Sequence, residues 1–347
     1  MMAKTTLPSP DFNCTAPECI YKAGVRPYRK GSFRLSAETI GPKFVVHNYG
    51  HGGAGITMSW GCADAVVKIV GKHAAPGTRV AVVGAGVMGL TAATLLTKDY
   101  TVSIYADRLS GTTSDVAGGQ WAPSVVEFDQ SNAAAKQQFE DILRVAYRMH
   151  EQRIGQNFGV SYRTNYTKKL SATFDKVPKD IISAPDDYPQ LPFAKLKSKG
   201  YGYKTLLVEP PVFLTRLRAD LRTAGVVPQH KVFGSAADVT NLAEPTIINC
   251  TGHGAGVLFH DKDIVPIKGQ LVLLKAQPGL DYLYSTDQTY VFPRSDHVVV
   301  GGSYECGVND ENPVPSMCEH IRKMAEDVFA GLAFTTADDR PWLMRNK

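Results

Sequence analysis

Glycines crowd into one short stretch near the start of this 347-residue sequence, HNYGHGGAGITMSWG at residues 47–61. Gly50, Gly52, Gly53 and Gly55 precede an apolar segment, residues 56–70, that is predicted to be a helix. Because glycine has no Cβ, such a backbone can approach a planar ring closely. The N-terminus of a following helix favours negative charge. The stretch therefore predicts a backbone that a ligand can approach closely, with a helix N-terminus facing it.

A second glycine pattern, Gly84, Gly86 and Gly89, has the GxGxxG spacing. In dinucleotide sites these glycines permit a tight turn, approach of a diphosphate and close helix–strand packing, and an acid about 20 residues later binds the ribose. Asp107 has that position. The predicted elements also follow the required order: a strand at 80–83, a helix at 90–96 and a strand at 101–105. NAD and FAD both use this unit, and Arg108 could even fit a phosphorylated ribose, so these residues leave the dinucleotide open.

The remaining segments predict further elements that position these glycines. From residue 160, short strand-like pieces rich in proline and aromatic residues indicate a mostly β substrate domain. The other predicted elements are a long amphipathic helix at 132–155, a helix at 211–223, strands at 230–239 and 246–250, alternating strands around a tyrosine-rich loop within 269–302, and a C-terminal helix at 317–329.

Composition narrows the class of protein. The net charge of +5 comes from 38 basic and 33 acidic residues without a long basic run, so we expect no nucleic-acid or membrane partner. The six cysteines show no CxxC spacing, which predicts reduced thiols and no metal site. The N-terminal residues lack a signal-peptide core and the last three are not an SKL-type signal, so a cytoplasmic location is expected.

Several motifs together resemble the D-amino acid oxidase family, FAD enzymes of the wider glycine and sarcosine oxidase group. They cover residues 23–307 and read GVRPYRKGSFRL, HNYGHGGAGITMSWGCA, VVGAGVMGL, ADRLSGTTSDVAGGQWAP, IINCTG, YVFP and VVVGG. The resemblance implies an α/β fold with a Rossmann-like FAD-binding domain and a second, mostly antiparallel β substrate domain.

The implied domains are discontinuous. The FAD-binding domain is expected to comprise residues 43–158 and 212–262. The substrate-binding domain is expected to comprise residues 20–42, 159–211 and 263–335, which leaves terminal extensions at 1–19 and 336–347.

The order of the motifs departs from the family. The arginine motif at 24–35 and the glycine stretch at 47–61 usually come last, whereas here they precede GxGxxG. The sequence therefore looks circularly permuted, with residues 71–78, GKHAAPGT, as the tether between the moved segment and the first dinucleotide strand. Chain ends that lie close together make such a rearrangement compatible with one fold.

The resemblance also implies roles at the substrate site. Arg26 would bind the carboxylate of an amino acid with two charge-assisted hydrogen bonds, and Tyr290 would add a hydroxyl. Tyr284, or Tyr282, would match the tyrosine of a mobile active-site loop, and the Gly53 carbonyl would receive the substrate amino group. No residue is expected to act as a catalytic base.

Other residues are implied to hold FAD non-covalently. Asp107 would bind the adenosine ribose, and Val232 would contact adenine through its backbone. The diphosphate would lie near Gly84, Gly86, Gly89, Arg108, Thr112, Thr113 and Ser114, and the flavin ring near Gly118, Gly119, Gln120, Gly52, Gly53, Ala54, Gly55, Ile56 and Thr57.

The implied activity is oxidative deamination of a D-amino acid by hydride transfer to flavin, with oxygen reduced to hydrogen peroxide. Three alternatives stay open: another small amine such as glycine, sarcosine or an acidic D-amino acid, a flavin dehydrogenase with a non-oxygen acceptor, and a flavoprotein that serves as a binding module. The partners expected are the substrate and oxygen, and a homodimer is allowed.

Overall fold

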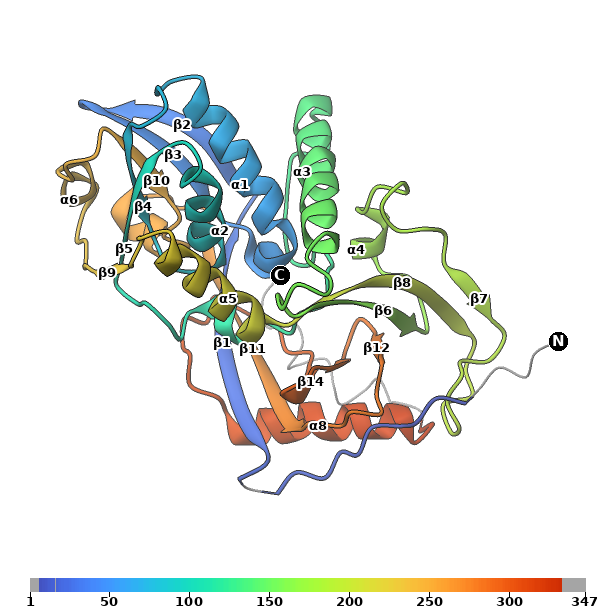
Figure 1. The fold of residues 1–347 in the computed structure, drawn as a ribbon. Helices are drawn as coiled ribbons and strands as arrows, with labels where there is room; N and C mark the ends of the chain where they lie inside the picture. Colours follow the sequence, from blue (N-terminus) through green and yellow to red (C-terminus); the bar gives the residue numbers. More distant parts are fainter. Residues whose placement is uncertain (1–5, 16, 333–347) are drawn as a thin grey trace.

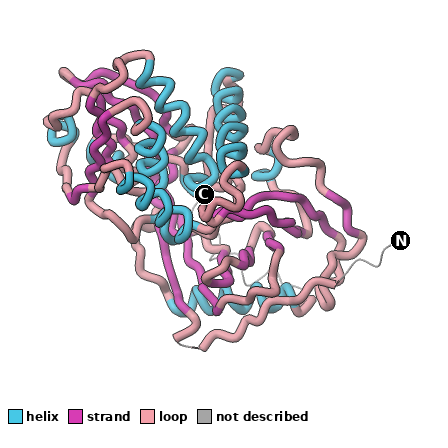
Figure 2. Tube along the Cα trace, in the orientation of Figure 1, coloured by secondary structure: helices cyan, strands magenta, loops and turns pink. Residues whose placement is uncertain are grey.

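The chain folds around two β-sheets with helices between and beside them (Figure 1). The computed structural model describes residues 6–15 and 17–332. Helices gather around the smaller sheet, whereas strands dominate the other half of the molecule (Figure 2). This is the α/β architecture with one Rossmann-like part and one mostly antiparallel part that the sequence predicts.

The smaller sheet has the strand order β2-β3-β10-β4-β5-β9. All neighbouring strands run parallel except β2, which pairs antiparallel with β3. Alternate residues of β4 enter different cores: Val80 and Val82 face α1 and α2, while Ala81 and Val83 face α6 and α7. Burial on both faces explains the continuous apolar sequence. The strands are β2 (Arg34–Ile40), β3 (Lys43–Tyr49), β4 (Arg79–Val83), β5 (Thr101–Ala106), β9 (Gln229–His230) and β10 (Thr246–Asn249).

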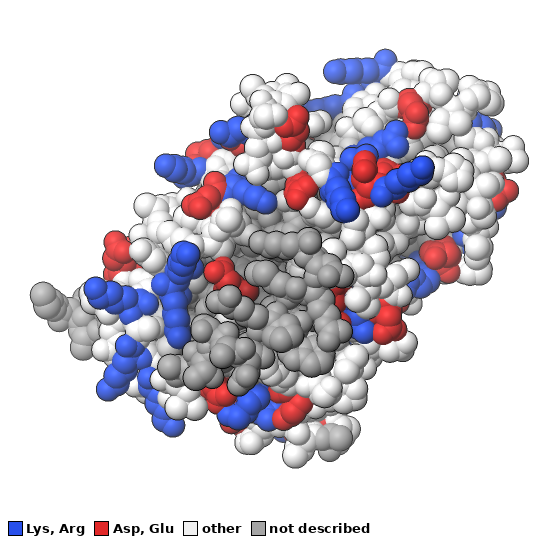
Figure 3. All heavy atoms as spheres, turned by 180° about the vertical axis from the view of Figure 1, so that it is seen from behind, with Lys and Arg blue, Asp and Glu red and all other residues white. Residues whose placement is uncertain are grey.

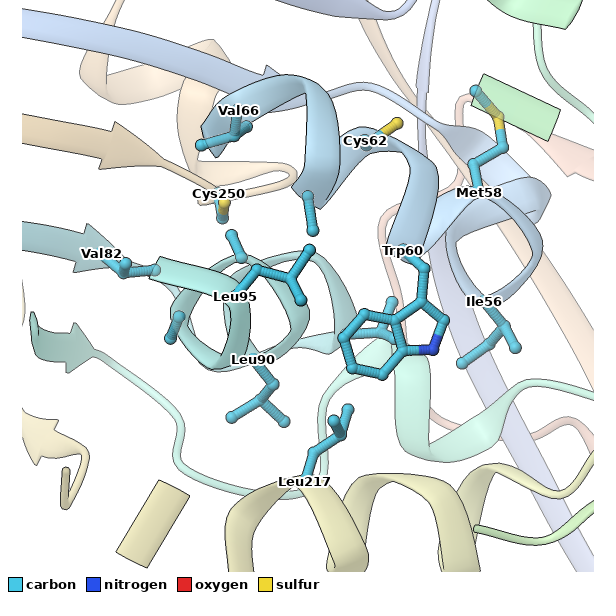
Figure 4. Close-up of a cluster of buried hydrophobic side chains, with 14 of the residues drawn as sticks. Ile56, Met58, Trp60, Cys62, Val66, Val82, Leu90, Leu95, Leu217 and Cys250 are labelled. Carbon is cyan, nitrogen blue, oxygen red and sulfur yellow. The ribbon is translucent and has the colours of Figure 1, made fainter. Parts of the chain in front are cut away.

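Three helices meet over one face of this sheet. Trp60 of α1 packs among Leu90 of α2 and Leu217 of α5 in the largest buried cluster (Figure 4). A Cβ at Gly61 would lie 2.0 Å from the carbonyl oxygen of Ile142, so this glycine lets α1 and α3 cross closely. The helices are η1 (Gly52–Ala54), α1 (Gly55–Gly71), α2 (Val87–Leu96), η2 (Thr113–Val116), α3 (Ala133–Glu151), α4 (Ala172–Asp175), α5 (Pro210–Thr223), α6 (Ala236–Thr240) and α7 (Gly254–Leu258).

The larger sheet has the order β1-β11-β14-β13-β12-β6-β8-β7, and β15 also pairs with β11. Neighbouring strands in this sheet run antiparallel, except β12 and β6, which run parallel to each other. Helix α8 (Pro315–Phe329) packs on its back, and Met317, Ile321 and Val328 are buried there as the helical spacing predicts. The strands are β1 (Ile20–Arg29), β6 (Val160–Thr167), β7 (Asp186–Tyr188), β8 (Gly200–Val208), β11 (Ile264–Lys275), β12 (Tyr282–Ser285), β13 (Tyr290–Pro293), β14 (His297–Gly301) and β15 (Glu305–Cys306).

The N-terminal arm runs along the same side as α8 (Figure 1). Phe12 is buried, and its ring centroid lies 5.8 Å from that of Phe329. Cys14 and Cys19 form a disulfide with a Cα–Cα distance of 5.0 Å. The expectation of six reduced thiols is therefore wrong for this pair, because a turn between the two residues brings their sulfur atoms together without a CxxC spacing. The other four cysteines are free.

Two sequence-derived segments differ from the structure. The predicted strand at 230–239 is wrong: β9 ends at His230, and α6 begins after Ser235, whose side chain accepts a hydrogen bond from the Asp238 amide as a helix N-cap. Residues 34–40, assigned from sequence to the substrate domain, form β2 at the edge of the smaller sheet. Residues 333–335, the expected end of the substrate domain, and residues 336–347, the expected C-terminal extension, lie outside the described residues.

Acidic and basic side chains both occur across the face shown in Figure 3. Within residues 6–15 and 17–332, no helix is long and apolar enough to cross a bilayer.

Candidate functional site

A cavity of about 460 Å³ lies where the two sheets meet. Its walls come from β1, β11, β13 and β8 of the larger sheet and from η1 and the start of α1 beside the smaller sheet. The volume falls within the range of small-molecule sites. Residues from both ends of the sequence, Arg26 and Tyr304 among them, therefore line one cavity.

The early glycine stretch forms one wall of this cavity. Gly52 has a φ of +53°, and a Cβ there would lie 1.8 Å from the carbonyl oxygen of Val125. The Gly53 amide donates to that same oxygen at 3.2 Å. Thr57 fixes the following helical turn, because its hydroxyl donates to the Ala122 carbonyl at 2.9 Å and accepts from the Ala122 amide at 3.1 Å. Only glycine lets this backbone pack against its neighbour and still face the cavity.

The GxGxxG turn connects β4 to α2 as predicted. A Cβ at Gly84, where φ is +118°, would lie 2.3 Å from the Cys250 carbonyl oxygen. A Cβ at Gly89 would lie 1.9 Å from the carbonyl oxygen of Gly84, so Gly89 sets the close packing of helix and strand. These two glycines have the structural roles that the motif predicts.

The first turn of α2 is open to an anionic ligand. A Cβ at Gly86 would meet nothing closer than the Ser114 hydroxyl at 3.4 Å. That hydroxyl accepts a hydrogen bond from the Val87 amide at 3.1 Å, and Val87 and Ser114 both line the cavity. Unpaired amides at a helix N-terminus bind phosphate groups. The turn and its surroundings therefore fit a dinucleotide diphosphate.

Arg26 and two tyrosines form a cationic corner in the cavity. The Arg26 guanidinium lies against Gly269, where a Cβ would be 2.3 Å from Nη2, and it donates to the Ser303 carbonyl at 3.4 Å. Burial raises the pKa of the Tyr290 hydroxyl, and the Arg26 charge acts in the opposite direction. Burial, followed by the nearby Cys306, raises the pKa of the Tyr304 hydroxyl, and the Arg26 charge again acts in the opposite direction. Both phenols therefore stay neutral donors beside one guanidinium.

Tyr290 is held in place by glycines on two sides. A Cβ at Gly301 would lie 2.3 Å from the Tyr290 hydroxyl oxygen, and one at Gly118 would lie 3.3 Å from its ring. The rings of Tyr290 and Phe292 stack with centroids 4.4 Å apart. This packing fixes the Tyr290 ring in the wall of the cavity that Arg26 also lines.

The structure brings together most of the residues predicted for the flavin ring and substrate. The residues that line the cavity are Arg26, Tyr290, Gly52, Gly53, Gly55, Ile56, Thr57, Thr113, Ser114, Gly118, Gly119 and Gln120. The others do not line it: Gly84, Gly86, Gly89, Asp107, Arg108, Thr112, Val232, Ala54 and Tyr284.

The residues predicted for the adenosine end lie toward the surface. The Asp107 carboxylate accepts a hydrogen bond from the Arg108 amide at 2.8 Å, and Arg108 pairs with Glu311 at 2.7 Å. Val232 is 68% exposed, just after Lys231, whose amide donates to the Ala106 carbonyl. This hydrogen bond places Val232 next to the end of β5, where Asp107 follows.

The role predicted for Tyr284 does not fit the structure. Tyr284 lies on β12, is fully buried, and packs its ring 5.0 Å from that of Phe329. Tyr282 is buried on the same strand and its hydroxyl donates to the Pro8 carbonyl. The predicted mobile loop is instead a tight turn, in which the Thr286 amide donates to the Thr289 carbonyl at 2.8 Å. The alternating tyrosines are strand residues that face the core.

Sequence reasoning missed several residues that shape the cavity. Gly269 and Gly301 make room for Arg26 and Tyr290, and their glycine signal was visible in the motifs KGQ and VVVGG. Val125 has a φ of +52°, which is rare for a β-branched residue, and it faces Gly52. Tyr203, which lines the cavity from β8, carries no local sequence signal.

Comparison with known proteins now identifies the family. The profile of the FAD dependent oxidoreductase family, DAO, matches residues 79–345. The chain belongs to this family. It is therefore an FAD-dependent oxidoreductase related to D-amino acid oxidases, and FAD is its cofactor.

Individual relatives are similar at modest identity. The chain is 27% identical to human D-aspartate oxidase over 244 residues, which covers 66% of this chain and 69% of that protein. It is 28% identical to a D-amino-acid oxidase of Streptomyces coelicolor over 254 residues, which covers 70% of this chain and 75% of that protein.

Solved structures share the fold. Glycine oxidase from Geobacillus kaustophilus aligns with a TM-score of 0.53 at 19% identity, covering 72% of this chain and 79% of that chain. Iminodiacetate oxidase from Chelativorans aligns with a TM-score of 0.53 at 17% identity, covering 73% of this chain and 79% of that chain.

Proposed function

We propose that this protein oxidises D-amino acids to imino acids, which water hydrolyses to 2-oxo acids, and that oxygen is reduced to hydrogen peroxide. The observation that carries this proposal is the cationic corner of Arg26, Tyr290 and Tyr304 in a cavity that also contains the glycine turn at Gly52 and Gly53. The relatives named D-aspartate oxidase and D-amino-acid oxidase support the substrate class.

The residues present fit bound FAD. Glycines leave space at the GxGxxG turn, and the start of α2 presents amides for a diphosphate. Gly52, Gly53 and the start of α1 offer a backbone wall and a helix N-terminus for the ring. When bound, FAD supplies the redox chemistry by accepting a hydride from the substrate Cα and passing the electrons to oxygen.

The protein's own contribution is to bind and orient the substrate. The Arg26 guanidinium offers parallel donors for the α-carboxylate, and the neutral hydroxyl of Tyr290 donates a further hydrogen bond. The Gly53 carbonyl is the proposed acceptor for the amino group. Fixing both groups leaves one orientation for the Cα hydrogen, which is how positioning lowers the barrier.

The test is a substrate panel on the FAD-loaded protein. Anaerobic mixing with D-amino acids should bleach the flavin absorbance, and mixing in air should produce hydrogen peroxide. L-amino acids, glycine and sarcosine form the comparison set. Bleaching by glycine or sarcosine but not by larger D-amino acids would assign a different amine. Bleaching without peroxide would assign an acceptor other than oxygen, and no bleaching by any amine would refute the proposal.

A further inference from the structure

Val125 has a backbone conformation that branched side chains rarely adopt. Its φ is +52°, in the left-handed region, and no other β-branched residue within 6–15 and 17–332 has a positive φ. Strain of this kind persists only where the surroundings impose it, and it concentrates at functional sites. Val125 lines the cavity. Its contacts on both sides therefore show what the strain maintains.

Residues 122–127, here called the Val125 strap, are fixed at both ends. At the first end, the Ala122 amide and carbonyl both form hydrogen bonds with the Thr57 hydroxyl. At the second end, the Glu127 carboxylate accepts a hydrogen bond from the Gly31 amide at 2.7 Å. The short backbone between the two ends is thereby held in one conformation.

The Glu127 end connects the strap to the strand that carries Arg26. The Phe33 amide, a few residues after the end of β1, donates to the Glu127 carbonyl at 3.0 Å. Within β1, burial and a hydrogen bond to the Glu127 carboxylate both raise the pKa of the Tyr28 hydroxyl. Tyr28 lies two residues after Arg26. The position of the strap is therefore set relative to Arg26.

The Val125 carbonyl forms the contact between the strap and the glycine turn. A Cβ on Gly52 would lie 1.8 Å from this oxygen, and the Gly53 amide donates to it at 3.2 Å. The carbonyl oxygen of Ser124 would lie 3.0 Å from a Cβ on Gly53. A negative φ at residue 125 would rotate the Val125 carbonyl away from Gly53. The left-handed conformation is thus what keeps the hydrogen bond in place.

We propose that Val125 is a positioning residue, whose left-handed backbone directs its carbonyl to the Gly53 amide and so holds the glycine turn at a fixed place relative to Arg26. This inference rests on the proposed function, in which Gly53 accepts the substrate amino group and Arg26 binds its carboxylate, and it adds the segment that keeps the two apart. The same turn begins the helix whose N-terminus favours negative charge on the flavin. Displacing the turn therefore alters the flavin reduction potential as well as substrate position.

Two substitutions test the backbone conformation of residue 125. Proline confines φ to about −65°, whereas asparagine tolerates the left-handed region. In Val125→Pro, the rate at which a D-amino acid reduces the flavin under anaerobic mixing should fall by about 10- to 100-fold, and the flavin potential should become more negative. Val125→Asn should keep the parent potential, and a rate within about twofold of the parent, because it keeps the carbonyl in place. His260→Pro is the matched control, since His260 also has a φ of +52° but is exposed and does not line the cavity.

Glu127 gives a second test in variants whose changed side chain is exposed. Glu127→Ala removes the acceptor for the Gly31 amide, whereas Glu127→Gln keeps a carbonyl oxygen there. Both variants lose the same charge, so the difference between them isolates the hydrogen bond. The reduction rate should fall by about 3- to 10-fold in Glu127→Ala, as expected for one hydrogen bond, and Glu127→Gln should restore it.

The flavin potential separates this inference from the proposed activity, because equilibration with redox dyes measures it without a substrate. A more negative potential in Val125→Pro, absent from Val125→Asn and His260→Pro, supports the inference even if no D-amino acid reduces the flavin. Parent-like potential and reduction rate in Val125→Pro would overturn it. Equal losses in Val125→Pro and Val125→Asn would overturn it too, since the side chain would then matter rather than the backbone. Should Val125→Pro not fold, equal rates and potentials in Glu127→Ala and Glu127→Gln would refute the role of the strap.

Discussion

The Arg26 guanidinium occupies the space directly over the Cα of Gly269, where an added Cβ would lie 2.3 Å from Nη2. We therefore expect Gly269→Ala to displace Arg26 without touching the FAD site. Because small errors in substrate position are costly, kcat/KM for D-amino acids should fall by on the order of 10- to 100-fold while FAD affinity is kept. Steady-state kinetics and flavin titration measure the two effects. Gly279→Ala is the control, since nothing lies within 4 Å of a Cβ there. Equal kinetics of the two variants would contradict this geometry.

Substitutions of Arg26 itself distinguish the contribution of its positive charge to kcat/KM from that of its parallel donors. Arg26→Lys keeps the positive charge but loses the parallel donors, and we expect kcat/KM to fall about 100-fold. Arg26→Ala should lose several kcal/mol of transition-state stabilisation, on the order of 1000-fold in kcat/KM. Arg148→Ala, at an exposed position on α3, should behave like the parent protein. Near-normal kinetics in Arg26→Ala would exclude the assigned role.

The dinucleotide turn gives a prediction about cofactor binding. In Gly89→Ala, the new methyl group would lie 1.9 Å from the Gly84 carbonyl oxygen, so α2 must shift away from β4. We expect loss of FAD affinity and a lower melting temperature. Gly71→Ala, at the end of α1, should instead keep FAD and leave stability equal or slightly higher, because alanine favours a helix by up to about 1 kcal/mol. Flavin content after purification and thermal melts distinguish the two. Stoichiometric FAD in Gly89→Ala would count against the assigned turn.

Two buried histidines predict sensitivity to acid. Burial lowers the pKa values of His51 and His150 to about 3, below the unfolded value near 6.5. The unfolded chain therefore takes up protons first, and the free energy of unfolding falls as the pH drops from about 6.5 toward 3. Each histidine contributes a slope of about 1.4 kcal/mol per pH unit in that window.

A variant isolates one of these contributions. His150 Nε2 lies 3.0 Å from the Ile56 carbonyl oxygen, so His150→Gln can keep a donor there while removing the titrating group. Denaturant titrations at several pH values should show a slope about 1.4 kcal/mol per pH unit smaller than in the parent. His230→Gln, at an exposed position, should leave the slope unchanged. An unchanged slope in His150→Gln would show that His150 is not buried as a neutral side chain.

The order of segments gives a prediction about topology. We propose that the chain is a circularly permuted relative of the family, which is supported by the family match that begins at Arg79 and by the contact of Phe12 with Phe329. A chain in which residues 79–332 precede residues 7–78, joined by a short flexible linker, should then fold and bind FAD. Circular dichroism and flavin content test this. An insoluble or FAD-free product from several linker lengths would argue that the present order is required.

Local patterns in the sequence were sufficient to predict the dinucleotide turn and the elements on either side of it. The apolar run at 80–83 and the glycines after it predicted β4, the turn and α2, because these residues have backbone roles that few other residue types can fill. The helix at 56–70 and the amphipathic helix at 132–155 also agree with α1 and α3. Buried parallel strands and long amphipathic helices carry their own periodicity.

The larger sheet was less predictable because its contacts join distant segments. The tyrosine-rich region around Tyr284 read as a loop, although Tyr282 and Tyr284 alternate as core residues of β12. Gly269 makes room for Arg26, far away in sequence, and Tyr203 accepts a hydrogen bond from Gln120 and pairs with Asn165 across the sheet. Such long-range relationships are set by tertiary pairing, which one sequence does not display. The Cys14–Cys19 disulfide was missed for a different reason, because it depends on a local turn rather than on a known spacing motif.

The pairing of β1 with β11 also constrains the order of events during synthesis. Ile267, which lies opposite Arg26, leaves the ribosome roughly 240 residues after it, a delay of about 10 to 50 s at ordinary elongation rates. During that time β1 has no neighbour in its sheet. The strand that carries Arg26 is thus translated early and seated among the last, so a nascent chain cannot assemble the corner of Arg26, Tyr290 and Tyr304 before nearly all of it has been made.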